Sequence, residues 1–161
     1  ITLYVPENFR FTAADIELGA GTLIINNLNA GKADIEVGAG QITCGGLLQT
    51  DKLDLEIGAG GTVIEQADIG KLNAKVGAGG LEMHGIIREK AKLECSMGGM
   101  KLKLDDSEKD YNYTIESAMG DVEIGSYSAK GLASEKRIDN GADKDITVEC
   151  SMGGVDISFK E

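Results

Sequence analysis

Apolar and polar residues alternate along most of the chain, and glycines interrupt the alternation at regular intervals. In the segment ADIELGAGTLII, which begins at Ala14, Ile16 and Leu18 alternate with carboxylates before the glycines. The alternation resumes after the glycines at Leu23 and Ile25. A period of two is typical of a strand with one buried face, and the glycines between two such runs indicate a tight turn. The pattern therefore predicts a strand–turn–strand unit.

This unit occurs seven times along the chain. The last glycine of each turn marks the repeats, at Gly21, Gly40, Gly60, Gly79, Gly98, Gly120 and Gly153. The spacings between these glycines are 19, 20, 19, 19, 22 and 33 residues. One unit cannot bury its apolar face alone, whereas stacked units share a continuous core. The sequence predicts an all-β protein, a β-solenoid of about seven 19–20-residue coils with capped ends. An antiparallel β-sandwich of the same strands is the alternative.

Stacked coils are expected to place equivalent residues in columns. One predicted core column lies before the turn and comprises Leu18, Val37, Ile57, Val76, Cys95, Ser117 and Cys150. A second lies after the turn and comprises Ile25, Cys44, Ile64, Met83, Leu102, Ile124 and Ile157. We interpret all three cysteines as core residues. If the coils stack in chain order, Ser117 separates Cys95 from Cys150, and two coil steps of about 9.6 Å exceed disulfide reach.

The turn changes along the chain from Gly-Ala-Gly to a form that contains methionine, and the string ECSMGG occurs twice, at residues 94–99 and 149–154. We interpret these methionines as fillers of wider coils; they are Met97, Met119 and Met152. A soft-metal site is a minor alternative. It would require Cys95, Met97, Cys150 and Met152 to converge from different coils. The single histidine, His84, is interpreted as a surface residue.

The repeats predict one β-repeat domain over residues 1–161. Residues 1–12 are expected to cap the N-terminal end, and residues 13–104 carry the regular repeats. Residues 105–161 carry irregular repeats with polar insertions at 105–112 and 125–145. Insertions between repeats map to loops, and loops often carry function. The second insertion is the first place to expect a binding site, and an excursion without a ligand is the alternative.

Two predicted outward columns carry charge. One comprises Glu17, Glu36, Glu56, Lys75, Glu94, Glu116 and Glu149, and the other comprises Lys32, Lys52, Lys71 and Lys90. We interpret them as a solvated sheet face that resists edge pairing. A ladder for a divalent cation or a basic partner is the sharper alternative.

Composition narrows the function classes. The formal net charge of −11 argues against nucleic acid and against an anionic membrane surface as partners. No apolar run reaches the roughly 18 residues of a membrane span, so we expect no membrane insertion by this segment. The repeated glutamates argue for scaffolding rather than for one tuned catalytic pair. We therefore expect no enzyme activity, no cofactor, and no catalytic or metal-binding residue.

Three features together resemble a known family: the opening ITLYVPENF, the Gly-Ala-Gly turns and the closing VECSMGGVDISF. The chain resembles a bacterial adhesin family of β-strand-repeat proteins, a domain of unknown function common in Firmicutes. In that family the domain follows an N-terminal membrane helix and faces the outside of the cell. The resemblance thus implies an extracellular location, with anchoring to the bacterial cell membrane by a segment absent from this chain.

The leading expectation is a non-enzymatic extracellular surface domain, an adhesin or envelope scaffold that presents a rigid β-repeat rod. Its partner would be a protein or a glycan at the cell surface. The alternative is an extracellular sensing or regulatory domain of a membrane-anchored signalling protein.

Overall fold

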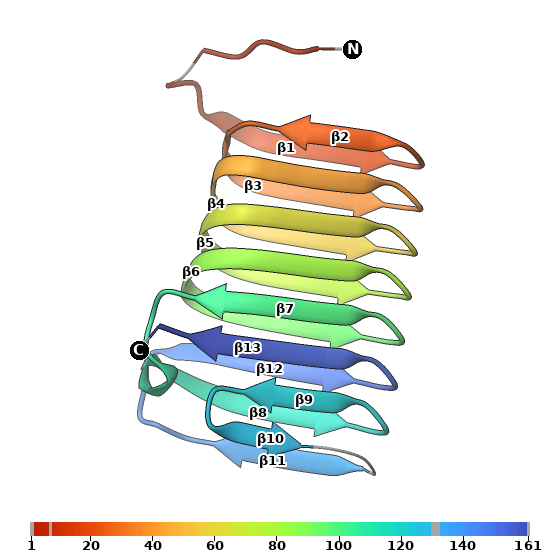
Figure 1. The fold of residues 1–161 in the computed structure, drawn as a ribbon. Coiled ribbons are helices and arrows are strands. Elements are labelled where there is room, and N and C mark those ends of the chain that lie inside the picture. The colour runs from red at the N-terminus through yellow and green to blue at the C-terminus, as the bar shows by residue number, and fades with distance from the viewer. Residues whose placement is uncertain (1, 7, 130–132, 161) are drawn as a thin grey trace.

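The computed structural model describes residues 2–6, 8–129 and 133–160 and has the form of a flattened β-solenoid (Figure 1). Within these residues, thirteen strands join in one continuous sheet, and the only helix is a short 3₁₀ turn, η1 (Glu108–Asp110). No helix of the described ranges has the length and apolar character needed to cross a membrane. The predicted β-solenoid is confirmed.

Each coil contributes one strand before the glycine turn and one strand after it. The pre-turn face contains β1 (Phe11–Leu18), β3 (Leu28–Val37), the second halves of β4 (Gln41–Ile57), β5 (Gly61–Val76) and β6 (Gly80–Cys95), then β12 (Lys144–Cys150), β8 (Tyr111–Ser117) and β11 (Ser134–Ile138). The post-turn face contains β2 (Thr22–Ile25), the first halves of β4, β5 and β6, then β7 (Gly99–Leu104), β13 (Gly154–Phe159), β9 (Asp121–Ile124) and β10 (Tyr127–Ala129).

Neighbouring coils pair in parallel and in register. Glu17, Glu36, Glu56, Lys75 and Glu94 are successive partners, as one coil per repeat requires. This parallel pairing distinguishes the fold from the antiparallel sandwich. The turns of neighbouring coils also stack closely. A Cβ added at Gly79 would lie only 2.0 Å from the carbonyl oxygen of Gly60. Only glycine lets the turn backbones approach in this way.

The seventh repeat lies between the fifth and the sixth repeats (Figure 1). Strand β12 pairs in parallel with β6 on one side and with β8 on the other, and β13 likewise joins β7 to β9. The expectation that coils stack in chain order is therefore wrong. Residues 105–110 carry the chain past one coil position, and the last repeat returns to fill that position. The repeated sequence fits because its two copies have the same alternation and the same turn.

Both predicted core columns face inward. Their members are buried except in the first coil, where Leu18 and Ile25 are half-buried. The three cysteines are buried and free, as core residues should be. Because of the changed coil order, Cys95 and Cys150 are direct partners across adjacent strands. The expected separation by Ser117 is wrong: Ser117 pairs with Cys150 from the other side.

The turn methionines point into solvent rather than into wider coils. The exposed fractions of Met97, Met119 and Met152 are 62%, 58% and 54%. Their turns keep the hydrogen bonds of the Gly-Ala-Gly turns: the amide of Met97 donates to Gly77 at 2.8 Å, as that of Ala78 does to Gly58. The interpretation of these residues as space fillers is corrected.

The two ends of the solenoid differ. At the N-terminal end, Leu3 and Tyr4 of the expected cap are 81% and 90% exposed, whereas Phe11 packs against the core and the ring of Phe9 lies 4.8 Å from that of Phe11. Residues 1 and 7 of that cap lie outside the described residues. At the other end, β10 and β11 pair antiparallel with β9 and β8 and close the stack. The second insertion therefore forms end strands, and its residues 130–132 lie outside the described residues.

Candidate functional site

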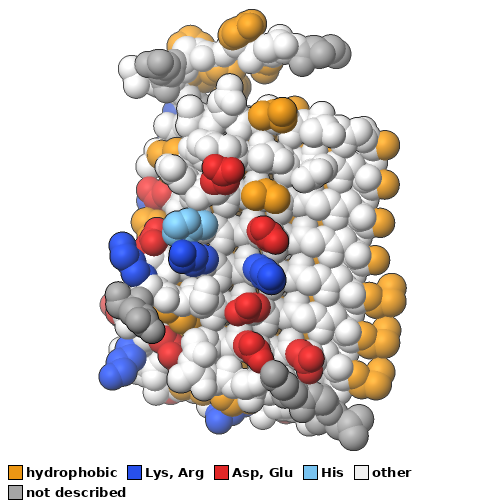
Figure 2. Space-filling view, viewed as in Figure 1, with side chains coloured by type: hydrophobic (Ala, Val, Ile, Leu, Met, Phe, Trp, Pro, Cys, Tyr) orange, Lys and Arg blue, Asp and Glu red, His pale blue; other side chains and the backbone are white. Residues whose placement is uncertain are grey.

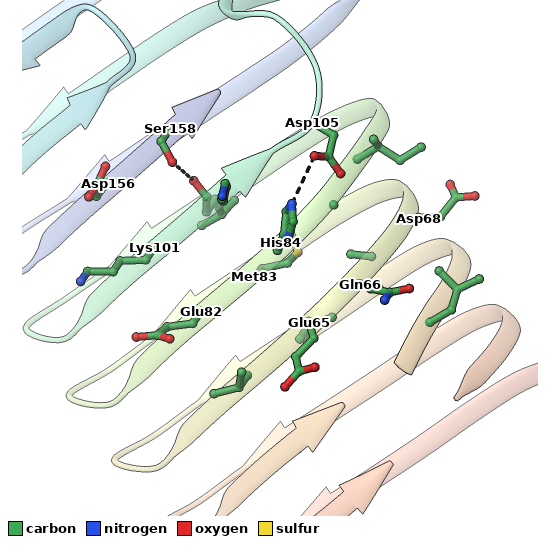
Figure 3. Close-up of a pocket in the computed structure, with 18 residues that line it drawn as sticks. Glu65, Gln66, Asp68, Glu82, Met83, His84, Lys101, Asp105, Asp156 and Ser158 are labelled. Atoms are coloured by element: carbon green, nitrogen blue, oxygen red, sulfur yellow. Dashed lines mark hydrogen bonds and ion pairs between the residues drawn. The ribbon is translucent and has the colours of Figure 1, made fainter. Parts of the chain in front are cut away.

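A shallow groove of about 960 Å³ runs across the post-turn face where the coils bend toward the next pre-turn strand (Figures 2 and 3). Strands β5, β6, β7 and β13 supply most of its lining. Its principal polar side chains are Glu65, Glu82, His84, Lys101, Asp156 and Ser158. Five repeats thus contribute to one surface, the second only through Leu47, and the seventh does so only because it follows the fifth in space.

Alternation within each strand positions the groove residues. The core residues Ile64, Met83 and Leu102 point inward, so that their neighbours point outward into the groove. The strand bends just beyond this row, where the pairing of β5 with β6 shifts register after Ile64. Gly85 allows the bend, because its φ is +145° and an added Cβ would lie 2.1 Å from the carbonyl oxygen of Ala67.

Charges alternate along the central row of the groove. Glu82 is the strand partner of Lys101, which is in turn the partner of Asp156. Partners on adjacent parallel strands are about 4.8 Å apart. Figure 2 shows acidic and basic side chains following one another down this face, and Figure 3 labels the three residues on neighbouring strands. Such a row presents charges of both signs at the fixed spacing of the coils.

His84 lies at the edge of the groove, and its Nε2 is 3.2 Å from Asp105 Oδ1 (Figure 3). Both side chains are more than two-fifths exposed. Ser158 Oγ donates to the carbonyl oxygen of Leu102 at 3.5 Å. Among the described residues, no hydrogen bond joins a hydroxyl or a thiol to the His84–Asp105 pair. The arrangement therefore offers polar contacts rather than an assembled nucleophile and base.

A second, smaller hollow of about 270 Å³ lies on the pre-turn face between carboxylates of the first coils. Lys32 Nζ binds Asp34 at 2.6 Å, and Lys52 Nζ binds Asp54 at 2.7 Å. Burial opposes ionisation of Asp54, but hydrogen bonds from Lys52 and Asn73 outweigh it and lower the pKa of this carboxyl. The hydrogen bond to Asp34 likewise raises the pKa of Lys32. Two members of the lysine column therefore neutralise Asp34 and Asp54, which lie outside the predicted glutamate column.

The described residues contain no group of three or more His, Cys, Asp or Glu side chains arranged to hold a metal ion. The soft-metal set is divided by the wall of the solenoid. Cys95 and Cys150 face the core at 2% and 3% exposure, whereas Met97 and Met152 are exposed at the turn. Burial, with a smaller effect from Cys150, raises the pKa of Cys95 to about 11. These four residues do not converge on one site.

Apart from Asp105, which lines the groove beside His84, the described residues of the insertions contribute to the end of the stack. Glu108, in the first insertion, accepts hydrogen bonds from the amide and hydroxyl of Ser126 in the second. The buried Tyr111 hydroxyl is 2.6 Å from Asp106 Oδ2 and 3.1 Å from the Ile87 carbonyl oxygen.

Sequence reasoning missed the groove, although the register of the repeats would have placed Val63, Glu82 and Lys101 in one outward row. Adding Asp156 to it required the spatial order of the coils.

Comparisons with known proteins give a family but no characterised relative. The family model described as Toastrack DUF4097 matches residues 8–158. No curated protein matches the chain. No solved structure matches it.

Proposed function

The chain belongs to the Toastrack DUF4097 family, a family of domains of unknown function, and from that premise we propose that it is a non-enzymatic binding module for a basic polypeptide. The module would act at the outer surface of a bacterial cell, in line with the adhesin resemblance of its motifs. The same binding event would serve adhesion, envelope scaffolding or, as the alternative role, sensing by a membrane-anchored signalling protein.

The charge of the groove is the observation that carries this proposal. Its lining includes two lysines, Lys101 and Lys103, against five carboxylates: Glu65, Asp68, Glu82, Asp105 and Asp156. The whole chain carries a formal net charge of −11. Local and overall charge have the same sign, so they attract and orient a basic partner together.

The shape and lining of the groove favour a polypeptide over a glycan. The groove is open and crosses several coils, which suits an extended segment with side chains at regular intervals. Phenylalanine and tyrosine are absent from its described lining, so it offers no flat carbon ring against which a sugar could pack. Hydrogen-bonded coils hold the charged row in place, so that a partner meets a preorganised surface.

Binding of fluorescent peptides to the purified chain tests the proposal. A Lys/Arg-rich peptide should bind, an equal-length peptide with Glu in place of its basic residues should not, and added salt should weaken the binding. The double variant Glu82→Gln/Asp156→Asn should bind roughly 5–10-fold more weakly, because two partly exposed charge contacts are lost. A glycan screen on the same protein tests the competing partner class.

The matched control is Glu36→Gln/Glu56→Gln, which removes the same charge from the pre-turn face. This control should reduce binding much less than the groove variant. Equal losses of peptide binding in the two variants would show nonspecific attraction by net charge, and would refute the groove as the binding site. Glycan binding without peptide binding would refute the partner class.

A further inference from the structure

Cys95 and Cys150 meet at the junction that the chain order does not predict. They are in-register partners on β6 and β12, the neighbouring parallel strands of the fifth and seventh repeats. Both side chains face the core. Cys95 Sγ lies 3.2 Å from the Gly98 carbonyl oxygen of its own coil and 3.8 Å from that of Gly154 in the seventh repeat. Burial raises the pKa of both thiols, and each thiol also influences the pKa of the other.

We propose that Cys95 and Cys150 are an oxidative crosslinking site, at which a disulfide joins the fifth and seventh repeats. In-register partners have Cα atoms about 4.8 Å apart, inside the roughly 4.4–6.8 Å range of disulfides. Cys150 Sγ now lies beside Gly120 of the sixth repeat, so its side chain must turn toward Cys95. The Cβ atoms must also approach from about 4.8 Å to at most about 4.5 Å, and the resulting strain makes the bond reversible by thiols.

The oxidant is a small-molecule disulfide such as oxidised glutathione. One cysteine thiolate attacks a sulfur of that disulfide, forms a mixed disulfide and releases one glutathione thiolate. The second cysteine thiolate then displaces the other glutathione thiolate and closes the protein disulfide. The protein loses two electrons to the oxidant, and the two cysteine protons end on the two released glutathione molecules. Because both thiols are buried in the native fold, the bond should form most readily while the seventh repeat is docking.

The crosslink would secure the C-terminal part of the stack. Among the described strands, the sixth repeat joins the fifth only through the seventh, since β8 pairs with β12 and β9 pairs with β13. A bond between Cys95 and Cys150 therefore also retains the sixth repeat and the closing strand β11. Closing a loop of this length in the unfolded chain should raise Tm by roughly 10 °C.

The column itself supplies matched controls. Cys44 lies in the other core column between Ile25 and Ile64, and should remain a free thiol. Ser117 is the sixth-repeat partner of Cys150, and its hydroxyl donates to the Gly120 carbonyl oxygen at 2.7 Å. Serine therefore fits this column, so Cys95→Ser and Cys150→Ser should fold.

The test refolds the full chain in a buffer of reduced and oxidised glutathione, followed by peptide mapping, thiol titration after denaturation, and thermal unfolding. The expected product is a monomer with one free thiol and a Cys95–Cys150 linked peptide, whose raised Tm is reversed by dithiothreitol. Cys44→Ser should behave in the same way with no free thiol. Cys95→Ser and Cys150→Ser should each lose the internal bond and the redox dependence of Tm.

Three free thiols after refolding, or a bond that includes Cys44, would overturn the proposal. So would a linked peptide without any rise in Tm, because the crosslink would then not secure the junction. The variant Cys95→Ser/Ser117→Cys moves the pair to the opposite side of the seventh repeat, so the introduced thiol should form a disulfide with Cys150 instead. Failure of this relocated pair would contradict the placement of the seventh repeat, on which the proposal depends.

Discussion

The first five repeats and the junction of the last repeats obey the same pairing rules but differ in how the chain reaches them. In the regular stack, spatial neighbours are also consecutive repeats, and β4, β5 and β6 run continuously around the bend. At the junction, Cys150 pairs with residues 55 and 33 positions earlier, Cys95 and Ser117. Register and strand direction are nevertheless the same. Stacking therefore depends on matched residues, whereas coil order depends on the segments that connect the coils.

Side chains that fix the connecting segments distinguish the junction from the regular stack. Lys144 Nζ binds Asp106 Oδ2 at 3.0 Å, and Asp106 also contacts the Tyr111 hydroxyl. The Asn112 side chain donates to the Ala142 carbonyl oxygen at 2.8 Å and accepts from the amide of Asn140 at 3.0 Å. These contacts hold the outgoing loop and the returning chain together, where the regular stack has an unbroken strand.

The largest expected effect compares one turn glycine from each region. Gly153→Ala should lower the free energy of unfolding by about 3 kcal/mol, because the added Cβ would lie 2.2 Å from the Gly98 carbonyl oxygen and 2.6 Å from Cys95 Sγ. Gly79→Ala should cost a similar amount in the regular stack. Urea unfolding measures both changes.

Gly154→Ala and Gly80→Ala are the controls, since added Cβ atoms there approach only one atom each, at 4.0 and 3.9 Å. They should leave stability within about 0.5 kcal/mol of the parent chain. A tolerated Gly153→Ala beside a damaging Gly79→Ala would show that the seventh repeat does not stack against the fifth.

Tyr111→Phe should lower the free energy of unfolding by about 1–2 kcal/mol, because it removes the buried hydroxyl that contacts Asp106 and the Ile87 carbonyl oxygen at the junction. Burial, assisted by Asp106, raises the pKa of this phenol, so it stays a donor over the usual pH range. Tyr4→Phe is the control, because Tyr4 is 90% exposed. Equal stability of the two variants would show that the Tyr111 hydroxyl does not stabilise the junction. Denaturant unfolding is again the measurement.

Lys92→Met tests an ion pair that crosses the junction, and the expected loss is smaller than for Tyr111. Lys92 Nζ lies 2.7 Å from Glu94 and 3.1 Å from Glu149 on the seventh repeat. The hydrogen bond from Lys92 lowers the pKa of Glu94, and bonds to Glu94 and Glu149 raise the pKa of Lys92. Lys32→Met is its counterpart in the regular stack.

The signs of these shifts define a pH window. A lowered carboxyl pKa stabilises the fold above the unfolded value of about 4.3, and this contribution is lost as pH falls through the folded value. A raised lysine pKa stabilises below about 10.4 and is lost as pH rises through the folded value. The difference in Tm between parent and Lys92→Met should be constant from about pH 5 to 9 and shrink below about pH 4. A difference that grows in acid would contradict the pairing.

The smallest expected effect concerns the exposed turn methionines. Met152→Ala and Met97→Ala should each change the free energy of unfolding by less than about 0.5 kcal/mol, because both side chains are more than half exposed. Met83→Ala is the buried control and should cost about 2–5 kcal/mol. A comparable loss of stability in Met152→Ala would show that this methionine fills space, and that the junction turns pack differently from the regular ones.

The sequence predicted whether a side chain points into the core or into solvent better than it predicted which coils lie next to each other. Alternation placed Cys150 inside and Glu149 outside, because a strand side chain has only two directions to choose from. It misjudged Met152, since the equivalent alanines are small enough for either side. It also missed the groove, because residue types show neither where a strand bends nor which coil comes next.

The sequence by itself determined the coil: its length, its glycine turn, its two core columns and its charged outer columns. These properties repeat every turn of the chain and follow from local alternation and close backbone contact. Only the tertiary structure decided the order of the last two repeats, the Cys95–Cys150 contact and the row that adds Asp156 to Lys101. Equivalent coils offer the same hydrogen bonds to any matched neighbour, so the connecting segments and their packing decide which neighbour each coil receives.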